Sequence, residues 1–376
     1  MKIGIDISNT IGEKTGIGYY TSNLVNALAQ IDRKNTYILY PFFYFINNTP
    51  YKTAVKPRQK NFSLRFQHIP KKIINRLWYS PFPKRWMLGN VDILHSTTYC
   101  APRDHSGKLI VTVYDLSFIT YPHFHTPVNR NHCIQATMNA INHADTIIAI
   151  SEHGKSELLK YYNVESDRIQ VTPLAASNIF TPVFQEQYQI KPYNIPSGYI
   201  LFIGTLEPRK NLKTLLQSYL TLSPETRKKH KLVIAGKKGW LAQDIEHLIR
   251  DNQTDVLYLG YIPEEQLPSL YRGALFFVYP SYYEGFGLPI LEAMNCGTPV
   301  ITANTSSMPE IAGDAALFFN PDKYSELVYA MNLLIHDEEL REELRKRGIA
   351  QALKYSWENT AKKTLKIYVD TYNREK

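Results

Sequence analysis

The chain has 376 residues, which is long for one domain and sufficient for two domains that each bury a core. Its hydrophobic content of 44% and charged content of 20% are ordinary for a soluble protein, and no repeat or low-complexity tract interrupts it. No signal peptide or membrane-spanning run is expected, because the most apolar stretch, residues 37–46, is too short to cross a bilayer. Three scattered cysteines show neither metal nor disulfide spacing, as in a protein of the reducing cytoplasm: Cys100, Cys133 and Cys296.

The net charge of +9 is unevenly distributed. No acidic residue lies between Asp32 and Asp92, whereas Lys and Arg recur through residues 52–86 among aromatic and aliphatic side chains. Trp78 and Trp86 lie near these cations and are expected to belong to one basic, aromatic face. Such a composition is typical of a surface that lies on anionic lipid. A merely basic loop region is an equally open interpretation. Nucleic acid is not an expected partner, because no nucleic-acid-binding motif accompanies the charge.

Short apolar runs alternate with helical patterns through residues 1–180. The predicted strands are residues 2–8, 36–42, 91–96, 109–116, 146–151 and 169–174, and the predicted helices are residues 18–30, 127–143 and 152–162. This alternation predicts βαβ units and a parallel sheet.

The alternation begins again at residue 198, after a proline-containing stretch that predicts a linker over residues 181–197. The predicted strands here are residues 199–204, 231–235, 256–259, 274–279, 299–302 and 316–319. The sequence therefore predicts an α/β protein with two doubly wound domains, 1–180 and 198–356, that face a cleft.

Glycines open the first predicted helix at Gly16 and Gly18. At such a position backbone N–H groups and the helix dipole can meet a phosphate. A nicotinamide dinucleotide fingerprint is excluded, because Thr21 replaces the third glycine and no acidic residue ends the second strand. A plain turn remains the alternative for this glycine pair.

The first strand of the second domain leads into the loop of residues 204–211, which includes Thr205. Its adjacent cations, Arg209 and Lys210, precede a helix at the carboxyl edge of a parallel sheet. A planar guanidinium fork and a point charge at this edge suit a diphosphate. Glu207 in the same loop is interpreted as structural.

Residues 279–300 predict a strand, a sharp turn and a helix. Gly285 and Gly287 free the backbone for the turn, Pro289 suits the first helical turn, and Gly297 suits the helix C-terminus.

Two carboxylates flank this turn. Glu284 precedes it, at the carboxyl end of the strand, and Glu292 lies one to two turns along the helix. The two can therefore reach different parts of one elongated ligand.

This run resembles the signature of the retaining glycosyltransferases of family four, which have the two-domain GT-B fold. The match includes the Glu-x7-Glu motif from Glu284 to Glu292 and continues, in the family's order, through residues 297–301, 309–310 and 313–316. The tail from Ser356 resembles the family's last helix, which implies that residues 357–374 pack back on the first domain. The resemblance covers nearly the whole chain and is weakest between residues 40 and 90.

The resemblance also implies roles for individual residues. Arg209 and Lys210 would neutralise the diphosphate leaving group, Glu284 would take sugar hydroxyls, and Glu292 would take the ribose hydroxyls. The other positions that it places at the donor are Gly16, Gly18, Thr205, Lys237, Ile262 and the backbone N–H groups of Phe286, Gly287 and Leu288.

In the first domain, Tyr114 and Asp115 end a buried strand. Many relatives have His-Asp here, and that His contacts the transferred sugar. Tyr114 can donate a hydrogen bond to the donor but does not titrate near neutrality, so no proton transfer is expected from it. Asp115 is expected among the catalytic residues.

The resemblance implies transfer of a hexose, with retention, from a nucleoside diphosphate sugar to a hydroxyl acceptor, such as a growing or lipid-linked bacterial polysaccharide. Likeness to mannosyltransferases, through residues 114–118 and the Ser356-Trp357 tail, makes GDP-mannose the first choice of donor. UDP-glucose and a deoxysugar donor remain open.

No cofactor or metal is expected, since the chain lacks an Asp-x-Asp pair and the basic pair supplies positive charge. The expected location is the cytoplasm, with possible attachment to the inner face of the plasma membrane. A catalytically silent sugar- or membrane-binding protein of the same fold is the alternative function.

Overall fold

A computed structural model describes residues 1–12, 16–43, 54–66, 69, 71–81, 83–98, 101–182, 195–239 and 243–374. They form two compact units, Met1–Leu174 with Ser356–Lys376, and Ala175–Tyr355. The first unit therefore ends before the predicted boundary at residue 180. Most of the predicted linker, residues 183–194, lies outside the described residues.

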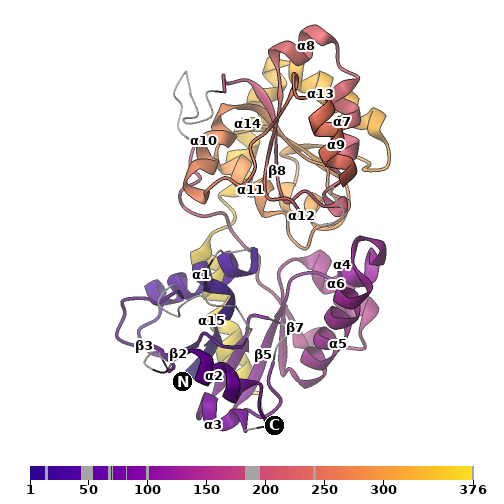
Figure 1. The fold of residues 1–376 in the computed structure, drawn as a ribbon. Coiled ribbons are helices and arrows are strands. Elements are labelled where there is room, and N and C mark those ends of the chain that lie inside the picture. Colours follow the sequence, from indigo (N-terminus) through magenta and orange to yellow (C-terminus); the bar gives the residue numbers. More distant parts are fainter. Residues whose placement is uncertain are drawn as a thin grey trace. The chain divides into compact units, whose positions relative to one another are not determined.

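The first unit contains a parallel sheet of seven strands in the order β3-β2-β1-β4-β5-β6-β7 (Figure 1). The strands are β1 (Lys2–Asp6), β2 (Thr36–Tyr40), β3 (Phe62–Leu64), β4 (Ile93–Ser96), β5 (Lys108–Val113), β6 (Thr146–Ala149) and β7 (Ile169–Val171). The central strands are buried on both faces, which is why they read as continuous apolar runs in the sequence.

The helices of this unit are α1 (Gly16–Ile31), α2 (Lys71–Trp78), α3 (Lys84–Leu88), α4 (Ser117–Thr120), α5 (Pro127–His143), α6 (Glu152–Tyr161) and α15 (Trp357–Asn373). Short 3₁₀ turns are η1 (Ser8–Thr10), η3 (Pro122–Phe124) and η4 (Ser166–Arg168). The six predicted strands and three predicted helices are all present. Four further elements, β3, α2, α3 and α4, were not predicted, and three of them, β3, α3 and α4, are too short to produce a clear period in the sequence.

The second unit contains a parallel sheet of six strands in the order β10-β9-β8-β11-β12-β13. The strands are β8 (Tyr199–Ile203), β9 (Leu232–Ala235), β10 (Val256–Tyr258), β11 (Ala274–Tyr279), β12 (Val300–Ala303) and β13 (Ala316–Phe319). The helices and 3₁₀ turns are η5 (Pro208–Lys210), α7 (Leu212–Leu220), α8 (Pro224–Lys229), α9 (Gln243–Asp251), η6 (Glu264–Gln266), α10 (Leu267–Gly273), α11 (Leu288–Asn295), α12 (Met308–Ala312), α13 (Tyr324–His336) and α14 (Glu338–Ala352).

Both sheets have the doubly wound topology that was predicted. In each, the order reverses beside the first strand of the unit, between β1 and β4 and between β8 and β11. Open α/β sheets bind ligands outside the carboxyl ends of the strands at such a switch point. Ligand-binding residues are therefore expected in the loops that follow these four strands.

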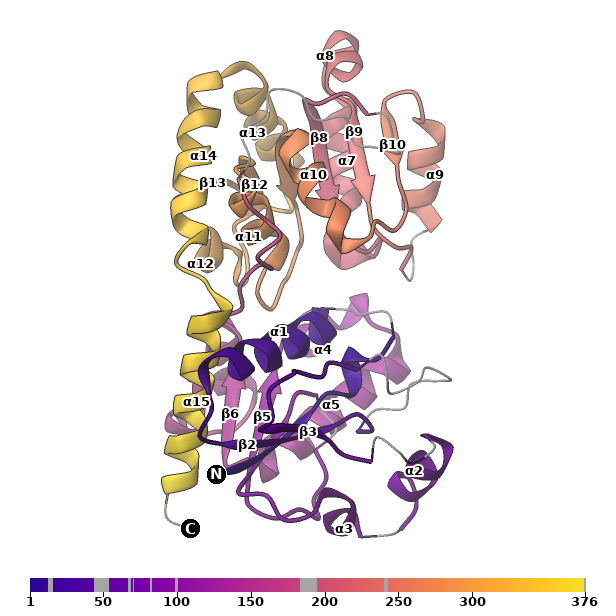
Figure 2. The ribbon, with the colours of Figure 1, turned by 90° about the vertical axis from the view of Figure 1, so that its left-hand side faces the viewer.

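The C-terminal helix α15 packs along α1 and the sheet of the first unit (Figure 2). Ser356 caps its N-terminus by accepting a hydrogen bond from the Asn359 N–H. Tyr368 shares a hydrogen bond of 2.7 Å with the buried His95 of β4, and Thr371 shares one of 2.8 Å with Thr146 of β6. A stripe of polar side chains thus fixes the register of the last helix on the sheet.

Candidate functional site

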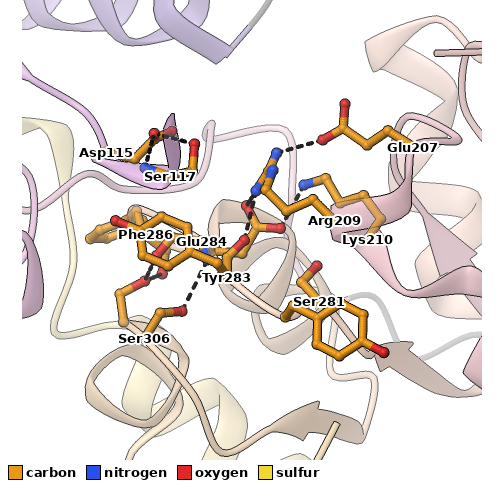
Figure 3. Close-up of polar contacts among 12 residues, drawn as sticks. Asp115, Ser117, Glu207, Arg209, Lys210, Ser281, Tyr283, Glu284, Phe286 and Ser306 are labelled. Carbon is orange, nitrogen blue, oxygen red and sulfur yellow. Dashed lines mark hydrogen bonds and ion pairs between the residues drawn. The ribbon is translucent and has the colours of Figure 1, made fainter. Parts of the chain in front are cut away.

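The switch point of the second unit carries a cluster of opposite charges. Arg209 and Lys210 end the loop after β8, and Glu284 follows β11, the neighbouring strand. The Arg209 guanidinium lies 3.0 Å from one Glu284 oxygen, and the Lys210 ammonium lies 2.7 Å from the other (Figure 3). The structure therefore brings together the basic pair and the first carboxylate of the Glu-x7-Glu motif.

Backbone contacts join the two loops as well. The Tyr282 N–H donates to the Arg209 carbonyl at 2.9 Å, and the Arg209 guanidinium donates to the Tyr283 carbonyl at 2.7 Å. Glu207 accepts a further bond of 2.7 Å from the Arg209 guanidinium, which fits its interpretation as a structural residue. Arg209 is thus held at several points in one orientation.

The charges balance within this cluster. Arg209 and Lys210 contribute two positive charges, and Glu207 and Glu284 contribute two negative charges. Burial raises the pKa of Glu284, but the adjacent Arg209 and Lys210 outweigh it and lower that pKa to about 2. Glu284 is therefore ionised at neutral pH, and an incoming anion would compete with it for the two cations.

The second motif carboxylate lies in a different environment. Glu292 on α11 is partly buried and accepts a hydrogen bond of 2.8 Å from the Tyr271 hydroxyl. Burial raises its pKa to about 7, since the bond from this neutral hydroxyl does not offset the loss of solvent. The two motif carboxylates therefore titrate in different pH ranges.

The turn between them forms as the sequence predicts at one of its two glycines. Gly287 has φ of 101° and precedes α11, whose second residue is Pro289. A Cβ at Gly287 would meet the Ile290 side chain at 3.2 Å, so both backbone angle and space favour glycine. Phe286 is buried, with its ring 6.0 Å from that of Tyr355.

Three of the predicted donor residues follow β8, β9 and β10, the strands on one side of the switch point. Lys237 is exposed, with its ammonium 4.6 Å from the centre of the Tyr261 ring. Ile262 is buried, and Thr205 is partly exposed after β8. These placements at the carboxyl ends of β8, β9 and β10 leave the predicted donor roles open to test.

A row of hydroxyls after β12 was not predicted. The Thr305 hydroxyl donates to the Tyr282 carbonyl at 2.9 Å, and the Glu284 N–H donates to the Ser306 hydroxyl at 2.9 Å. Ser307 donates to the carbonyls of Glu284 and Phe286. The signal in the sequence was three consecutive hydroxyl residues that begin two positions after a buried strand at the same sheet edge.

The first unit has a separate set of polar residues after β5. Tyr114 is buried, and its hydroxyl donates to the Thr97 carbonyl at 2.9 Å. Donation to a ligand would require this hydroxyl to change partner. Asp115 accepts hydrogen bonds from both the N–H and the hydroxyl of Ser117, and Ser117 also contacts the His125 ring at 3.1 Å. The predicted roles of Tyr114 and Asp115 stay predictions.

The switch point of this unit holds a carboxylate that sequence reasoning missed. Asp6 ends β1 and is fully buried, and it accepts hydrogen bonds from Ser8 and from the Thr98 hydroxyl. Burial raises its pKa to about 6, although these donors oppose the rise. Gly16 and Gly18 open α1 beyond it, while the preceding residues 13–15 lie outside the described part.

Family models match both parts of the chain. A model described as Glycosyltransferase Family 4 matches residues 14–175, and one described as Glycosyl transferases group 1 matches residues 185–351.

Curated proteins similar to this chain include two glycosyltransferases that are described as mannosyltransferases. The chain is 34% identical to the O-antigen chain mannosyltransferase B of Escherichia coli, over 94% of this chain and 96% of that protein. It is 32% identical to the serotype-specific mannosyltransferase WbdA of Escherichia coli, over 58% of this chain and 28% of that longer protein.

Solved structures share the fold over the whole chain. The sucrose-phosphate synthase of Thermosynechococcus elongatus superposes with a TM-score of 0.77 at 19% identity, covering 99% of each chain. WaaG, a glycosyltransferase involved in lipopolysaccharide biosynthesis, superposes with a TM-score of 0.69 at 14% identity, covering 97% of this chain and 99% of WaaG. At these identities the likeness concerns the GT-B fold.

Proposed function

The chain belongs to glycosyltransferase family 4, and we propose that it transfers mannose, with retention of configuration, from GDP-mannose to a hydroxyl of a bacterial polysaccharide. The observation that carries the proposal is the cluster of the partly buried Arg209 and Lys210 with the buried Glu284 at the switch point of the second sheet. The choice of mannose rests on the relative that is 34% identical over nearly the full length of both chains.

In the proposed reaction the bond between the sugar's anomeric carbon and the diphosphate breaks, and the acceptor oxygen bonds to that carbon. The acceptor's proton passes to the departing phosphate oxygen. Arg209 and Lys210 stabilise the charge that develops on the diphosphate, a task for which fixed cations in a site of low dielectric are well suited. Glu292 would accept hydrogen bonds from the ribose hydroxyls.

Retention without a protein nucleophile is consistent with the state of Glu284. Both of its oxygens are bound by cations, at 3.0 Å and 2.7 Å, which reduces the nucleophilicity of the carboxylate. We therefore assign Glu284 to sugar hydroxyls and propose that acceptor and leaving group use the same face of the sugar.

A donor panel tests this proposal. The purified protein would be incubated with GDP-mannose, GDP-fucose, UDP-glucose and UDP-galactose, each with and without an acceptor glycan, and nucleotide release would be measured. GDP release from GDP-mannose that depends on acceptor supports the proposal. Nucleotide release from a UDP-sugar alone would show that the donor is that UDP-sugar and not GDP-mannose. No nucleotide release from any donor would favour a catalytically silent binding protein.

We also propose that the basic segment of the first unit meets an anionic membrane surface, where a lipid-linked acceptor would lie. The exposed residues of α2 and α3 and of the segment after α2 combine cations with large apolar side chains: Lys72, Ile73, Arg76, Tyr79, Arg85 and Trp86. Each cation near an anionic surface contributes on the order of 1 kcal/mol. No helix in the described part of the chain is long and apolar enough to span a membrane.

The structure corrects one member of the predicted aromatic face. Trp78 is buried, with its ring 5.1 Å from Phe42 and 4.7 Å from Phe43, because it lies one helical turn after the buried Ile74 on the inner side of α2. Lys52 and the side chain of Lys71 lie outside the described residues. The proposed membrane face therefore excludes Trp78.

Co-sedimentation with liposomes tests the membrane proposal. The protein should pellet with anionic vesicles at low salt and remain in solution with neutral vesicles, which carry no charge to attract it. Pelleting with anionic vesicles should decrease at high salt, since salt screens the attraction. Replacing Lys72, Arg76 and Arg85 by Gln should abolish pelleting. A control with Lys228, Lys229 and Lys363 replaced by Gln removes the same charge elsewhere and should still pellet. Equal behaviour of the two variants would contradict the proposal.

A further inference from the structure

The loop after β12 holds the Glu284 turn from the side opposite the cations. Ser306 accepts a hydrogen bond from the Glu284 N–H (Figure 3). The one O–H of the fully buried Ser307 is shared between the carbonyls of Glu284 at 2.9 Å and Phe286 at 2.8 Å. The carboxylate of Glu284 is bound by Arg209 and Lys210, so side chain and backbone of this residue are both fixed.

Ser306 adopts a backbone conformation that is unfavourable for serine. Its φ of 53° lies in the left-handed region, where Gly and Asn are the usual residues. Such a conformation persists only where the surroundings enforce it, and it is common near functional sites. Glycine would relieve the strain but would remove the oxygen that accepts the Glu284 N–H.

Ser307 precedes α12 at the position where a serine usually caps the helix, yet its side chain makes no cap hydrogen bond. Its hydroxyl instead reaches the two turn carbonyls. In a planar trans peptide the N–H points away from the C=O, so a carbonyl of Phe286 bound to Ser307 directs the Gly287 N–H to the opposite side. The hydroxyl of Ser307 thereby sets the direction of a backbone donor in the motif turn.

We propose that Ser306 and Ser307 are positioning residues that hold the Glu284–Gly287 turn ready for the sugar and phosphate groups of the donor. The inference rests on the proposed function for the identity of that ligand. The contacts themselves are independent of it, because they are made by the protein alone.

Three substitutions separate positioning from simple support of the fold. Ser307→Ala removes the donor to both carbonyls. Ser306→Gly removes the acceptor and relieves the positive φ, and Ser306→Asn keeps a short polar acceptor in a residue that tolerates this φ. Ser218→Ala is the matched control, because Ser218 is a fully buried serine of the same unit whose hydroxyl donates to the Tyr324 carbonyl, away from Glu284.

Steady-state kinetics provides the first measurement. Ser307→Ala should lower kcat about tenfold to a hundredfold with little change in the donor KM, since a misplaced group loses rate more than ground-state binding. Ser306→Asn should recover most of the activity that Ser306→Gly loses. Equal kcat in Ser307→Ala and Ser218→Ala, or no recovery in Ser306→Asn, would overturn the inference.

Hydrogen exchange provides a second measurement that needs no activity. Amides of residues 284–287 should exchange about tenfold faster in Ser307→Ala than in wild type and Ser218→Ala, as expected for lost hydrogen bonds of this strength. If the wild type transfers no sugar but the exchange difference appears, the proposed function fails and the positioning remains. Unchanged exchange in this turn would contradict the positioning itself.

Discussion

Asp6 and Glu284 occupy comparable places in the two units, but their surroundings are opposite. Each carboxylate is buried and lies at or beyond the carboxyl end of a strand that borders the switch point of a parallel sheet. Glu284 is bound by two cations, which bring its pKa to about 2 in spite of burial. Asp6 accepts hydrogen bonds from the neutral donors of Ser8 and Thr98, and burial raises its pKa to about 6.

This difference shows that the topology selects the place and the neighbouring side chains select the chemistry. Around Glu284 the side chains are ionised, and Arg209 and Lys210 can exchange the Glu284 carboxylate for an anionic ligand. Around Asp6 the donors are neutral, and their hydrogen bonds tie the loops after β1 and β4 together. The arrangement around Glu284 suits electrostatic stabilisation of a leaving group. The arrangement around Asp6 suits a structural role, in which it holds two loops in place.

The largest expected effect comes from removing a cation on the charged side. Lys210→Ala should lower turnover by about 10²–10³-fold or more, because the leaving group loses a preorganised charge. The exposed Lys213, one turn along on α7, offers a matched control, and Lys213→Ala should retain wild-type turnover. A folded Lys210→Ala variant with near wild-type turnover would show that the cluster does not serve the leaving group.

The next largest effect is expected on stability, when the carboxylate of Glu284 is removed. Glu284→Gln leaves Arg209 and Lys210 with Glu207 alone, a loss of about 3–5 kcal/mol in the free energy of unfolding for a broken buried pair. Because the folded pKa of Glu284 is depressed, its contribution is complete above its ordinary value of 4.5 and is lost as pH falls toward 2.

Urea unfolding across this pH range measures the effect. The difference between wild type and Glu284→Gln should shrink steadily as the pH is lowered below 4.5. A difference that does not vary with pH would mean that the two cations do not stabilise an ionised Glu284.

Asp6→Asn should show the opposite dependence. The folded pKa of Asp6 is raised, so wild type loses stability as pH rises from 3.8 through about 6, whereas the Asp6→Asn variant does not. The variant would therefore gain about 1–3 kcal/mol on wild type over that range, with one hydrogen bond to Thr98 altered. Unfolding of both proteins on either side of this range measures it, and parallel pH profiles would contradict the assignment.

Much of the fold and part of the site follow from local patterns. Every strand predicted from apolar runs is present, and α5 begins and ends at the predicted residues, since Pro127 at its start gives a clear signal. The basic pair and Glu284 could be placed at one sheet edge because carboxyl ends of parallel strands share that edge.

The remaining features depend on contacts that sequence spacing does not contain. Glu284 is 74 positions from Lys210, so their ion pair, and hence the neutrality of the cluster, emerges only when β8 and β11 lie side by side. The sequence position of Ser307 is typical of a helix cap, and only its partners in the structure show that it is bound to the turn. Trp78 reads as a surface aromatic beside cations, but the inward face of α2 buries it.

The smallest expected effect concerns metal ions, and it tests whether the charged side is sufficient by itself. We propose that transfer proceeds without a divalent metal, so activity should survive excess EDTA. A diphosphate can bind the two cations that Glu284 binds in the protein alone, while Glu284 accepts hydrogen bonds from sugar hydroxyls instead. The four charges sum to zero before binding, so this exchange, rather than a positive surplus, must offset the phosphate charge. Initial rates with EDTA, and with Mg²⁺ or Mn²⁺ restored, measure it. Activity that disappears with chelator and returns with metal would show that the cations of this edge need a partner.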